Sequence, residues 1–358
     1  MTSNNQLYGN QQNHLLRDWG FMDGVHSEVD NRLLGRVTAV HRGHWELATA
    51  AGSFRAVTAG RLGHQQAEVP VTGDWVVWHG MPGHDERLVI DQVLPRRTQI
   101  TRKAAGTASA QVLVANVDWV WIVTSLNRDW NPARLERYLA MVWESGAKPA
   151  VVLSKCDLVD NRDDWIEKTE AVAFGAPIYP ISAINDQGLD AAAASLQPGE
   201  TVALLGSSGV GKSTLTNHLL ARDRQETSAV RDLDQRGRHT TTHRELFQLP
   251  SGALLIDTPG LRELGLWTGE AAVAEVFAEV EALAGACRFR DCRHGNEPGC
   301  AVRAAMETGD LDQRRFDNYG KLQREVQRQE ELQTASGRQA RKQREKTLHK
   351  HIRQVKNR

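Results

Sequence analysis

The amino-acid sequence predicts a multidomain protein with an N-terminal all-β barrel, a central α/β domain and a mainly helical C-terminal domain. Three observations predict this order. Short runs rich in Val, Trp and Thr fill residues 33–95, as they do in small barrels. From residue 112 onward, uniformly apolar runs alternate with helical ones, which is typical of a parallel sheet covered on both faces. After residue 265 the pattern turns polar and helical and is interrupted by a group of cysteines.

Length and composition narrow the class of protein. At 358 residues with 40% hydrophobic content, the chain has room for two or three domains. No apolar run approaches the roughly 18 residues that cross a bilayer, and the start MTSNNQLYGNQQNHLL has no apolar signal core. We therefore expect a cytoplasmic protein with no membrane partner, whose polar residues 1–32 are disordered. Three of the four cysteines cluster late, which in a reducing compartment favours a metal site over a disulfide.

Residues 33–98 are predicted to form the barrel. The expected strands are LLGRVTAV, HWELATA, SFRAVTAG, DWVVWHG and RLVIDQVL, each bounded by Gly, Pro or His. Strands of this number and length favour an oligonucleotide-binding (OB) barrel, with another small barrel such as an SH3-like one as the alternative. Trp45, Trp75 and Trp78 can all belong to its core, so no set of aromatic residues for base stacking stands out.

Residues 99–111 are predicted to be a linker, because the surrounding stretch PRRTQITRKAAGTASA is basic, rich in small residues and without periodicity. Basic side chains beside the barrel could contact RNA phosphates, with an affinity that falls as salt rises. They are Arg96, Arg97, Arg102 and Lys103.

A phosphate-binding loop is predicted at residues 206–214, within an α/β domain that spans residues 112–265. GSSGVGKST fits GxxxxGK[ST], follows the apolar run TVALL and precedes the helical run TLTNHLL. The glycines let backbone N–H groups surround phosphates, and the helix N-terminus adds its dipole. Lys212 is expected to contact the β- and γ-phosphates in a catalytic role, and Ser213 to bind Mg²⁺. The predicted nucleotide-binding residues here are Gly206, Ser207, Ser208, Gly209, Val210, Gly211, Lys212, Ser213 and Thr214.

Two further stretches are expected to complete the phosphate site. In ALLIDTPG, Asp257 ends an apolar strand, where it can hold Mg²⁺ through water, and the Gly260 N–H can turn toward the γ-phosphate. RGRHTTTHREL, residues 236–246, fits a first switch in which the Thr241 hydroxyl completes the Mg²⁺ shell, with Thr240 as the alternative. A polar loop that happens to contain a run of threonines is the other interpretation.

A base-recognition element comes earlier in the chain than the phosphate loop. SKCD, within LSKCDLVD at residues 153–160, resembles the NKxD element of GTPases. Asp157 can accept hydrogen bonds from guanine N1–H and the exocyclic amine, while the Lys155 stem packs over the ring. ISA, residues 181–183, resembles the loop whose backbone amide meets guanine O6. The predicted base-site residues are Ser154, Lys155, Cys156, Asp157, Ser182 and Ala183.

The chain thus presents base element, base loop, phosphate loop, first switch and second switch in that order. Rotating the order gives an ordinary GTPase sheet, so we infer a circularly permuted P-loop GTPase domain. Ser154 replaces an asparagine whose amide would bridge to both the phosphate loop and guanine N7, and serine is too short to do both. Guanine selectivity is still expected, because Asp157 is the discriminating group. Cys156 is interpreted as a lone packing cysteine.

The usual water-orienting glutamine is missing after DTPG. Leu261 stands there and can neither donate nor accept a hydrogen bond, so intrinsic hydrolysis should be slow. His239 is the candidate for positioning the attacking water, because it lies one or two residues from the predicted Mg²⁺ threonine. A solvent-facing histidine is the alternative interpretation.

Residues 266–358 are predicted to form a zinc-binding domain with a basic tail. Three thiolates and one imidazole in CRFRDCRHGNEPGC make a closed tetrahedral shell that suits one structural Zn²⁺. The ligands are Cys287, Cys292, His294 and Cys300. The stretch 321–358 holds 12 Lys and Arg against four acids, although the whole chain has a net charge of zero. This suggests an anionic partner such as RNA, with a solvated helix end as the alternative.

A permuted GTPase with an OB-like barrel before it and a CxxxxCxHxxxxxC cluster after it resembles the ribosome small-subunit-dependent GTPase A family of bacteria, over roughly residues 33–320. The resemblance implies a GTPase that binds the 30S small ribosomal subunit and its rRNA and acts late in subunit maturation. It implies hydrolysis of GTP, held with Mg²⁺, to GDP and phosphate under ribosome stimulation. We expect a monomer.

Other functions remain compatible with these residues. One is a nucleotide-gated RNA-binding protein with incidental hydrolysis, which is compatible with Leu261 because leucine cannot orient the attacking water. Another is a permuted GTPase that serves a different RNA or protein partner. We also hypothesise that γ-phosphate pulling on Gly260 reorients the zinc domain and basic tail, so that the nucleotide state gates RNA contact.

Overall fold

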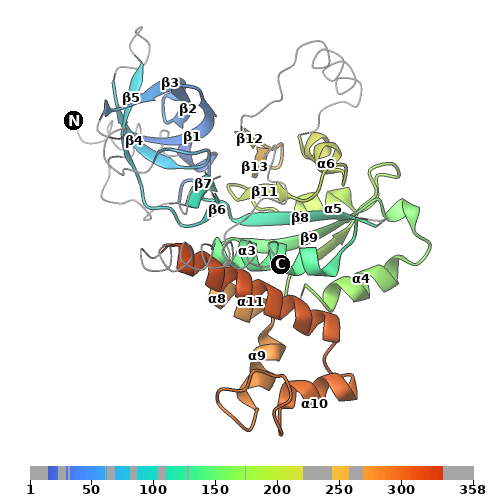
Figure 1. The fold of residues 1–358 in the computed structure, drawn as a ribbon. Helices are drawn as coiled ribbons and strands as arrows, with labels where there is room; N and C mark the ends of the chain where they lie inside the picture. The colour runs from blue at the N-terminus through green and yellow to red at the C-terminus, as the bar shows by residue number, and fades with distance from the viewer. Residues whose placement is uncertain are drawn as a thin grey trace, which may run out of the picture. The chain divides into compact units, whose positions relative to one another are not determined.

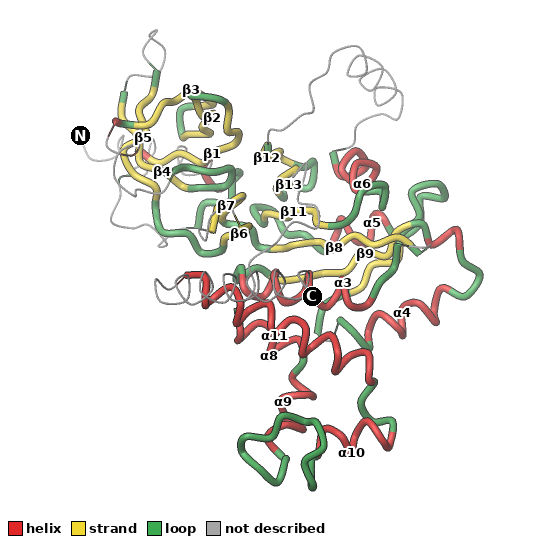
Figure 2. The backbone as a smooth tube through the Cα atoms, in the orientation of Figure 1, coloured by secondary structure: helices red, strands yellow, loops and turns green. Residues whose placement is uncertain are grey.

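The computed structural model describes residues 15–22, 30, 33–60, 62, 69–80, 87–103, 110–126, 129–173, 175–220, 244–257 and 269–333. The chain separates into two units, each treated by itself below. Unit 1 comprises residues 1–101, 112–135 and 145–264, and unit 2 comprises residues 102–111, 136–144 and 265–358. Figures 1 and 2 show the elements of both.

The first part of unit 1 is a closed barrel, as predicted. Its strands are β1 (Leu34–His41), β2 (His44–Thr49), β3 (Gly52–Thr58), β4 (Trp75–His79) and β5 (Leu88–Val93). They pair in the order β1-β2-β3-β5-β4, and β4 pairs back with β1. A parallel β3–β5 pair among antiparallel ones gives the OB type of barrel rather than the SH3-like alternative.

The barrel core explains the tryptophans. Alternation along each strand places Val37, Leu47, Val76 and Ile90 inside, where all are buried. Trp78 belongs to the same cluster and Trp45 packs against it, while Trp75 lies in a second buried cluster. All three are therefore core residues.

The expectation that residues 1–32 are disordered is wrong for residues 15–22. Leu16 and Phe21 are buried in the cluster that also holds Trp75, with Trp19 packed against it. The Trp19 carbonyl accepts a hydrogen bond from the buried Arg36 guanidinium. The apolar residues of LLRDWGF give this stretch enough surface to bury, which the polar residues before it lack.

The prediction of a linker without secondary structure at residues 99–111 also needs correction. Strands β6 (Gln99–Lys103) and β7 (Ala110–Ala115) form a two-stranded sheet, and residues 104–109 lie outside the described part. Ile100 is buried, and the Gln99 N–H donates to the Ser145 carbonyl at 3.0 Å. A single buried isoleucine in a basic run is too weak a periodic signal to predict a strand.

The rest of unit 1 is the predicted α/β domain. Parallel strands β8 (Trp119–Ser125), β9 (Lys148–Ser154), β10 (Ile178–Pro180), β11 (Thr201–Leu205) and β13 (Leu254–Asp257) pair in the order β10-β9-β8-β11-β13. In the sheet, β12 (Glu245–Gln248) lies next to β13 and antiparallel to it. On its other side β12 pairs with β1, where Glu245 lies opposite Ala39. The two parts of unit 1 thereby share one continuous sheet of eleven strands.

Short helices complete the domain. They are α4 (Arg162–Glu170), α5 (Leu189–Ala194) and α6 (Lys212–Leu219), with a 3₁₀ turn at Cys156–Leu158. Leu189, Leu215 and Leu219 from α5 and α6 join the sheet residues Trp121 and Val152 in one buried cluster. The strand before the phosphate loop, β11, lies between β8 and β13 and is parallel to both, although it comes late in the chain. This is the arrangement that a permuted domain requires.

Unit 2 is mainly helical, as predicted. It contains α8 (Glu270–Val276), α9 (Ala278–Gly285), α10 (Ala301–Thr308), α11 (Gln313–Gln333) and most of α3 (Pro132–Glu144). Glu136 of α3 is fully buried and accepts hydrogen bonds from Arg315 at 3.0 Å and from Arg314 at 3.3 Å, both on α11. Among the described residues, no helix is long and apolar enough to cross a membrane.

Candidate guanine-nucleotide site and metal centre

The phosphate loop joins β11 to α6 in the conformation its glycines require. Gly206 has φ +149°, and a Cβ on it would lie 2.2 Å from the Val123 carbonyl oxygen, so only glycine fits. Gly211, with φ +100°, directly precedes the first residue of α6. Val210 between them is buried in the core cluster and anchors the loop to the domain. The loop therefore has a fixed backbone whose N–H groups can face an anion.

Lys212 and its neighbours lie at the first turn of α6. The Lys212 ammonium donates to the Gly206 carbonyl at 2.6 Å and to the Ser207 carbonyl at 2.5 Å, which places it across the curve of the loop. Ser213 and Thr214 are exposed there. The predicted phosphate-contacting side chains thus come together at one helix N-terminus, where the helix dipole favours negative charge.

The base element lies against the phosphate loop, although the two are some fifty residues apart in sequence. The buried Ser154 hydroxyl donates to the Val210 carbonyl at 2.5 Å. The Lys155 ammonium donates to the Gly209 carbonyl at 2.8 Å. Lys155 adopts φ +58°, a left-handed conformation that costs about 1–3 kcal/mol for a non-glycine residue and is enriched at active and ligand-binding sites.

Asp157 is held by the second predicted base loop. The Ser182 hydroxyl donates to Asp157 Oδ1 at 2.6 Å, and the Cys156 N–H donates to the Ile181 carbonyl at 3.1 Å. Ser182 is fully buried and Asp157 is half-buried, so a hydrogen bond from the protein interior orients the carboxylate. This role of the Ser182 side chain was not predicted, because the motif assigns only a backbone amide to the loop. The available signal was a serine two residues after a short strand.

Cys156 is a packing residue, as predicted. It is buried, and burial raises the pKa of its thiol, so it stays neutral at ordinary pH. Its place in the base element therefore depends on its backbone and its small apolar side chain.

Asp257 ends β13, the parallel neighbour of β11, so it lies at the same sheet edge as the phosphate loop. It is exposed at that edge. The remaining predicted residues of the phosphate site lie outside the described part of the chain. They are His239, Thr240, Thr241, Gly260 and Leu261.

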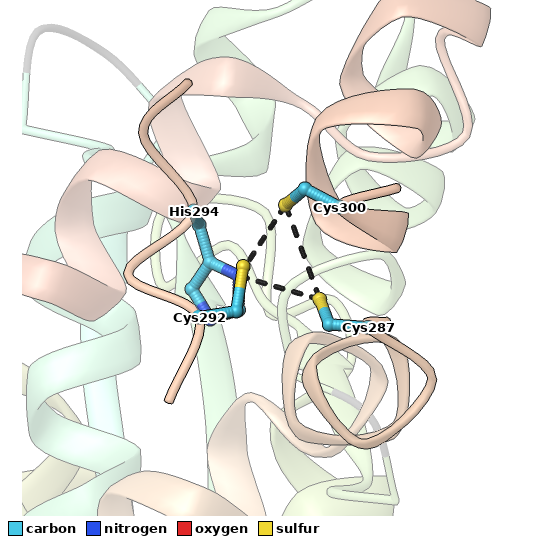
Figure 3. A group of neighbouring side chains, drawn as sticks. All are labelled: Cys287, Cys292, His294 and Cys300. Atoms are coloured by element: carbon cyan, nitrogen blue, oxygen red, sulfur yellow. Dashed lines mark hydrogen bonds between the residues drawn. The ribbon is translucent and has the colours of Figure 1, made fainter. Parts of the chain in front are cut away.

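The cysteine cluster has the dimensions of a tetrahedral metal site (Figure 3). The sulfurs of Cys287 and Cys300 are 3.9 Å apart, and the His294 Nδ1 is 3.6 Å from the first and 3.5 Å from the second. Cys292 completes the group, with every ligating atom within 4.8 Å of the others. Ordinary Zn–S and Zn–N bond lengths place tetrahedral ligands about 3.8 Å apart for two sulfurs and about 3.6 Å for sulfur and nitrogen. The cluster could therefore hold a zinc-like ion.

Local backbone supports this arrangement. Helix α10 begins directly after Cys300, whose sulfur accepts from the Arg303 N–H at 3.4 Å. Burial opposes the Cys287 thiolate, but the N–H groups of Val302 and Ala301, together with the Cys292 and Cys300 thiols, lower the pKa of Cys287. At Cys292 the His294 N–H favours the thiolate, but burial and the neighbouring Cys300 and Cys287 raise the pKa to about 11. The N-terminus of α10 thus favours the charged form of Cys287, the form that binds metal.

The predicted phosphate-contacting arginines are largely engaged within the protein. Arg96 forms two hydrogen bonds to the Asp74 carboxylate, at 2.7 and 2.8 Å, and its side chain is 5% exposed, so it is a structural residue and not a surface cation. Arg97 pairs with Asp118 at 3.1 Å, and Arg102 donates to Gln111. The Lys103 side chain lies outside the described part.

Comparison with known proteins agrees with this site. The family model described as RsgA GTPase matches residues 93–267. A protein of Oceanobacillus iheyensis named "Small ribosomal subunit biogenesis GTPase RsgA 1" is 43% identical over 90% of this chain and 93% of its own length. A protein of Opitutus terrae named "Small ribosomal subunit biogenesis GTPase RsgA" is 51% identical over 83% of this chain and 84% of its own length.

Solved structures show the same architecture. YjeQ from Thermotoga maritima matches with a TM-score of 0.61 at 26% identity, covering 82% of this chain and 98% of its own. YloQ, described as a circularly permuted GTPase, matches with a TM-score of 0.58 at 25% identity, covering 82% of this chain and 94% of its own. The chain therefore belongs to the RsgA GTPase family and is a GTP hydrolase with a circularly permuted GTPase domain.

Proposed function

We propose that this GTPase binds the 30S small ribosomal subunit, acts in its late maturation and hydrolyses GTP faster when bound there. The observation that carries the nucleotide part of the proposal is the contact of the base element with the phosphate loop, from Ser154 to Val210 and from Lys155 to Gly209. The subunit part is supported by the names of the relatives, which are small-subunit biogenesis GTPases. A cytoplasmic place of action follows from that partner.

For the nucleotide itself, we infer a division of roles among the site residues. Asp157, already oriented by Ser182, accepts hydrogen bonds from the guanine edge, and the Lys155 stem covers the ring. Lys212 contacts the β- and γ-phosphates from its position across the loop. Ser213 and Asp257 are proposed to hold Mg²⁺, which would neutralise phosphate charge when it is bound. The Thr241 hydroxyl is proposed to bind Mg²⁺ and the Gly260 N–H to contact the γ-phosphate, so both interactions would depend on the presence of that phosphate.

The proposed hydrolytic step depends on His239. Because Leu261 cannot orient water, another group must do so, and His239 lies two residues before the proposed Mg²⁺ threonine, Thr241, in the same stretch. Replacing His239 with Ala is expected to lower subunit-stimulated turnover while leaving nucleotide affinity unchanged. His243→Ala is a matched control in the same stretch. Equal turnover of His239→Ala and the native protein would remove this role.

The zinc centre and basic tail are proposed as the RNA-contacting part. One structural Zn²⁺ held by Cys287, Cys292, His294 and Cys300 would fix the loop between α9 and α10. The tail beyond Gln333 adds cationic charge. We propose that the nucleotide state gates this contact through Gly260, so subunit affinity should differ between GDP and a non-hydrolysable GTP analogue. A monomer suffices for this scheme.

The test is GTP turnover by the full-length protein alone, with purified small subunits and with purified large subunits. A Lys212→Ala variant run in parallel measures GTPase activity that contaminates the subunits. The proposal predicts strong stimulation by small subunits only. Stimulation by neither subunit would contradict the ribosomal role and would leave a GTPase that serves another RNA or protein partner. Slow turnover with tight, nucleotide-dependent binding to the small subunit would favour an RNA-binding protein with incidental hydrolysis.

A further inference from the structure

The hairpin that joins β1 and β2 carries two histidines at its end. His41 and His44 are the last cross-strand pair before the turn formed by Arg42 and Gly43. Gly43 has φ +85°, and nothing lies within 4 Å of the place a Cβ would take, so it fits a tight two-residue turn. The short turn fixes the two histidine backbones opposite each other.

A carboxylate lies on the same face of this hairpin. Glu46 is two residues beyond His44 and opposite Ala39 in the register, and side chains alternate between faces along a strand. His41, His44 and Glu46 therefore share one face. Val40 and Trp45, on the other face, pack against the barrel core. Core packing thus holds the three polar side chains outward and half-buried.

These side chains are close enough to share an ion. His41 Nε2 lies 3.2 Å from Glu46 Oε1, and one ligating atom from each of the three residues lies within 4.8 Å of the others. Nitrogen and oxygen ligands of tetrahedral Zn²⁺ are about 3.4 Å apart, given bonds of about 2.0–2.1 Å. The His41 and His44 rings stack with centroids 4.6 Å apart, so the two imidazoles lie next to each other beside the Glu46 carboxylate.

The charges on this face suit a divalent cation. Two neutral imidazoles and one carboxylate give a net charge of −1, and Glu245 of β12 is the next residue in the same row, opposite Ala39. Arg55 of β3 lies opposite Glu46 and is exposed, so it competes for the carboxylate.

We propose that His41, His44 and Glu46 bind one divalent transition-metal ion of the Zn²⁺ class, at a site separate from the cysteine cluster. Imidazole and carboxylate ligands suit Zn²⁺, Co²⁺ and Ni²⁺, whereas the cysteine cluster selects softer coordination. Three protein ligands leave a position for water or for an oxygen atom of a binding partner. The site lies on the barrel and is independent of the proposed nucleotide chemistry.

The experiment is a Co²⁺ titration of the untagged full-length protein, with zinc first loaded into the cysteine cluster and loosely held ions removed by a mild chelator. Bound Co²⁺ is counted by equilibrium dialysis, and its absorption spectrum is recorded. We expect about one Co²⁺ per chain beyond the cluster zinc, with a spectrum that lacks thiolate charge transfer. Losing a direct ligand should weaken binding by at least the ~10- to 100-fold that losing an outer partner costs.

Three variants decide the assignment. His44→Ala and the isosteric Glu46→Gln should lose this ion or bind it at least tenfold more weakly, and circular dichroism checks that each folds. His79→Ala, a barrel histidine bonded to Asp91, should bind it as the native protein does. The proposal is overturned if the native protein takes up no additional Co²⁺, if the additional ion shows thiolate charge transfer, or if His44→Ala and Glu46→Gln retain it unchanged.

Discussion

The Ser154 hydroxyl donates a hydrogen bond of 2.5 Å to the carbonyl of Val210, in the middle of the phosphate loop. A serine at the first position of the base element therefore makes one of the two bridges that an asparagine makes in the general GTPase pattern. The short side chain is sufficient because β9 ends at Ser154, directly beside the loop. The departure from the NKxD pattern thus preserves the link between base and phosphate recognition.

Ser154→Ala is expected to weaken GDP and GTP binding roughly tenfold, because a buried carbonyl loses its partner at a cost of about 1–3 kcal/mol and the loop loses its anchor to the base element. Equilibrium titration with a fluorescent nucleotide measures the change. Ser195→Ala removes a hydroxyl that bonds the Ala192 carbonyl within α5, and should leave affinity unchanged. If both variants bind as tightly as the native protein, the Ser154 contact plays no part in nucleotide binding.

Cys292→Ser is expected to lower the zinc content below about one ion per chain after washing with a mild chelator, because it removes one of four ligands. The melting temperature of unit 2 should fall with it, since metal binding supplies folding free energy. Elemental analysis and thermal unfolding measure the two effects. Cys156→Ser is the matched control, and it should retain zinc; equal zinc in both variants would contradict the tetrahedral site.

Glu136→Gln is expected to destabilise unit 2 by about 1.5–3 kcal/mol, because it weakens the buried charge-assisted hydrogen bonds from Arg314 and Arg315, although Arg315 keeps its pair with Glu279. Glu325→Gln breaks the pair with Arg137, which is half-exposed rather than buried, and should cost about 1 kcal/mol. Urea unfolding and hydrogen exchange of α11 amides compare them. Equal destabilisation by the two changes would show that burial does not decide the strength of these pairs.

Unit 2 is expected to lose stability in alkaline solution through Tyr319. Burial and the hydrogen bond of its hydroxyl to Glu281, at 2.6 Å, raise the pKa of Tyr319 above its ordinary value of about 10. Because the folded pKa is the higher one, this contribution is complete below about pH 10 and is lost as pH rises toward the folded pKa.

The measurement is the unfolding free energy between pH 9 and 11, roughly the range around the ordinary tyrosine pKa. Tyr319→Phe should show a shallower fall than the native protein, and Glu281→Gln, which keeps an acceptor but removes the charge, an intermediate one. Identical slopes in all three would contradict the assignment.

Local patterns predicted most of the fold. Strand β11 and the phosphate loop follow from TVALLGSSGVGKST, because an apolar strand, a glycine-rich turn and a helix N-terminus each have their own sequence signal. The cysteine cluster was equally clear, since its ligands lie within one short loop. The permutation followed from motif order, and the strand order confirms it.

Contacts between distant residues could not be predicted in the same way. An arginine within a strand ordinarily indicates a solvent-exposed position. Arg36 is instead buried and donates to the Asn116 carbonyl and to Thr201 Oγ1, both at 2.9 Å. Burial lowers its pKa to about 10, and it remains a cation at ordinary pH. Arg96 was predicted to contact RNA phosphates for the same reason, because its partner Asp74 lies 22 residues away on the barrel. Such pairs depend on three-dimensional proximity, which periodicity does not encode.

The most direct test of the permuted guanine site is the ratio of kcat/KM for GTP and ATP, measured on the native protein under the same conditions, with Asp157→Asn compared for GTP and XTP. Asp157 pairs with donors that adenine lacks at those positions, so the native protein should prefer GTP by roughly 10⁴-fold. Asp157→Asn should reverse the preference toward XTP, whose base presents an oxygen to the amide. Equal kcat/KM for GTP and ATP in the native protein would contradict the account.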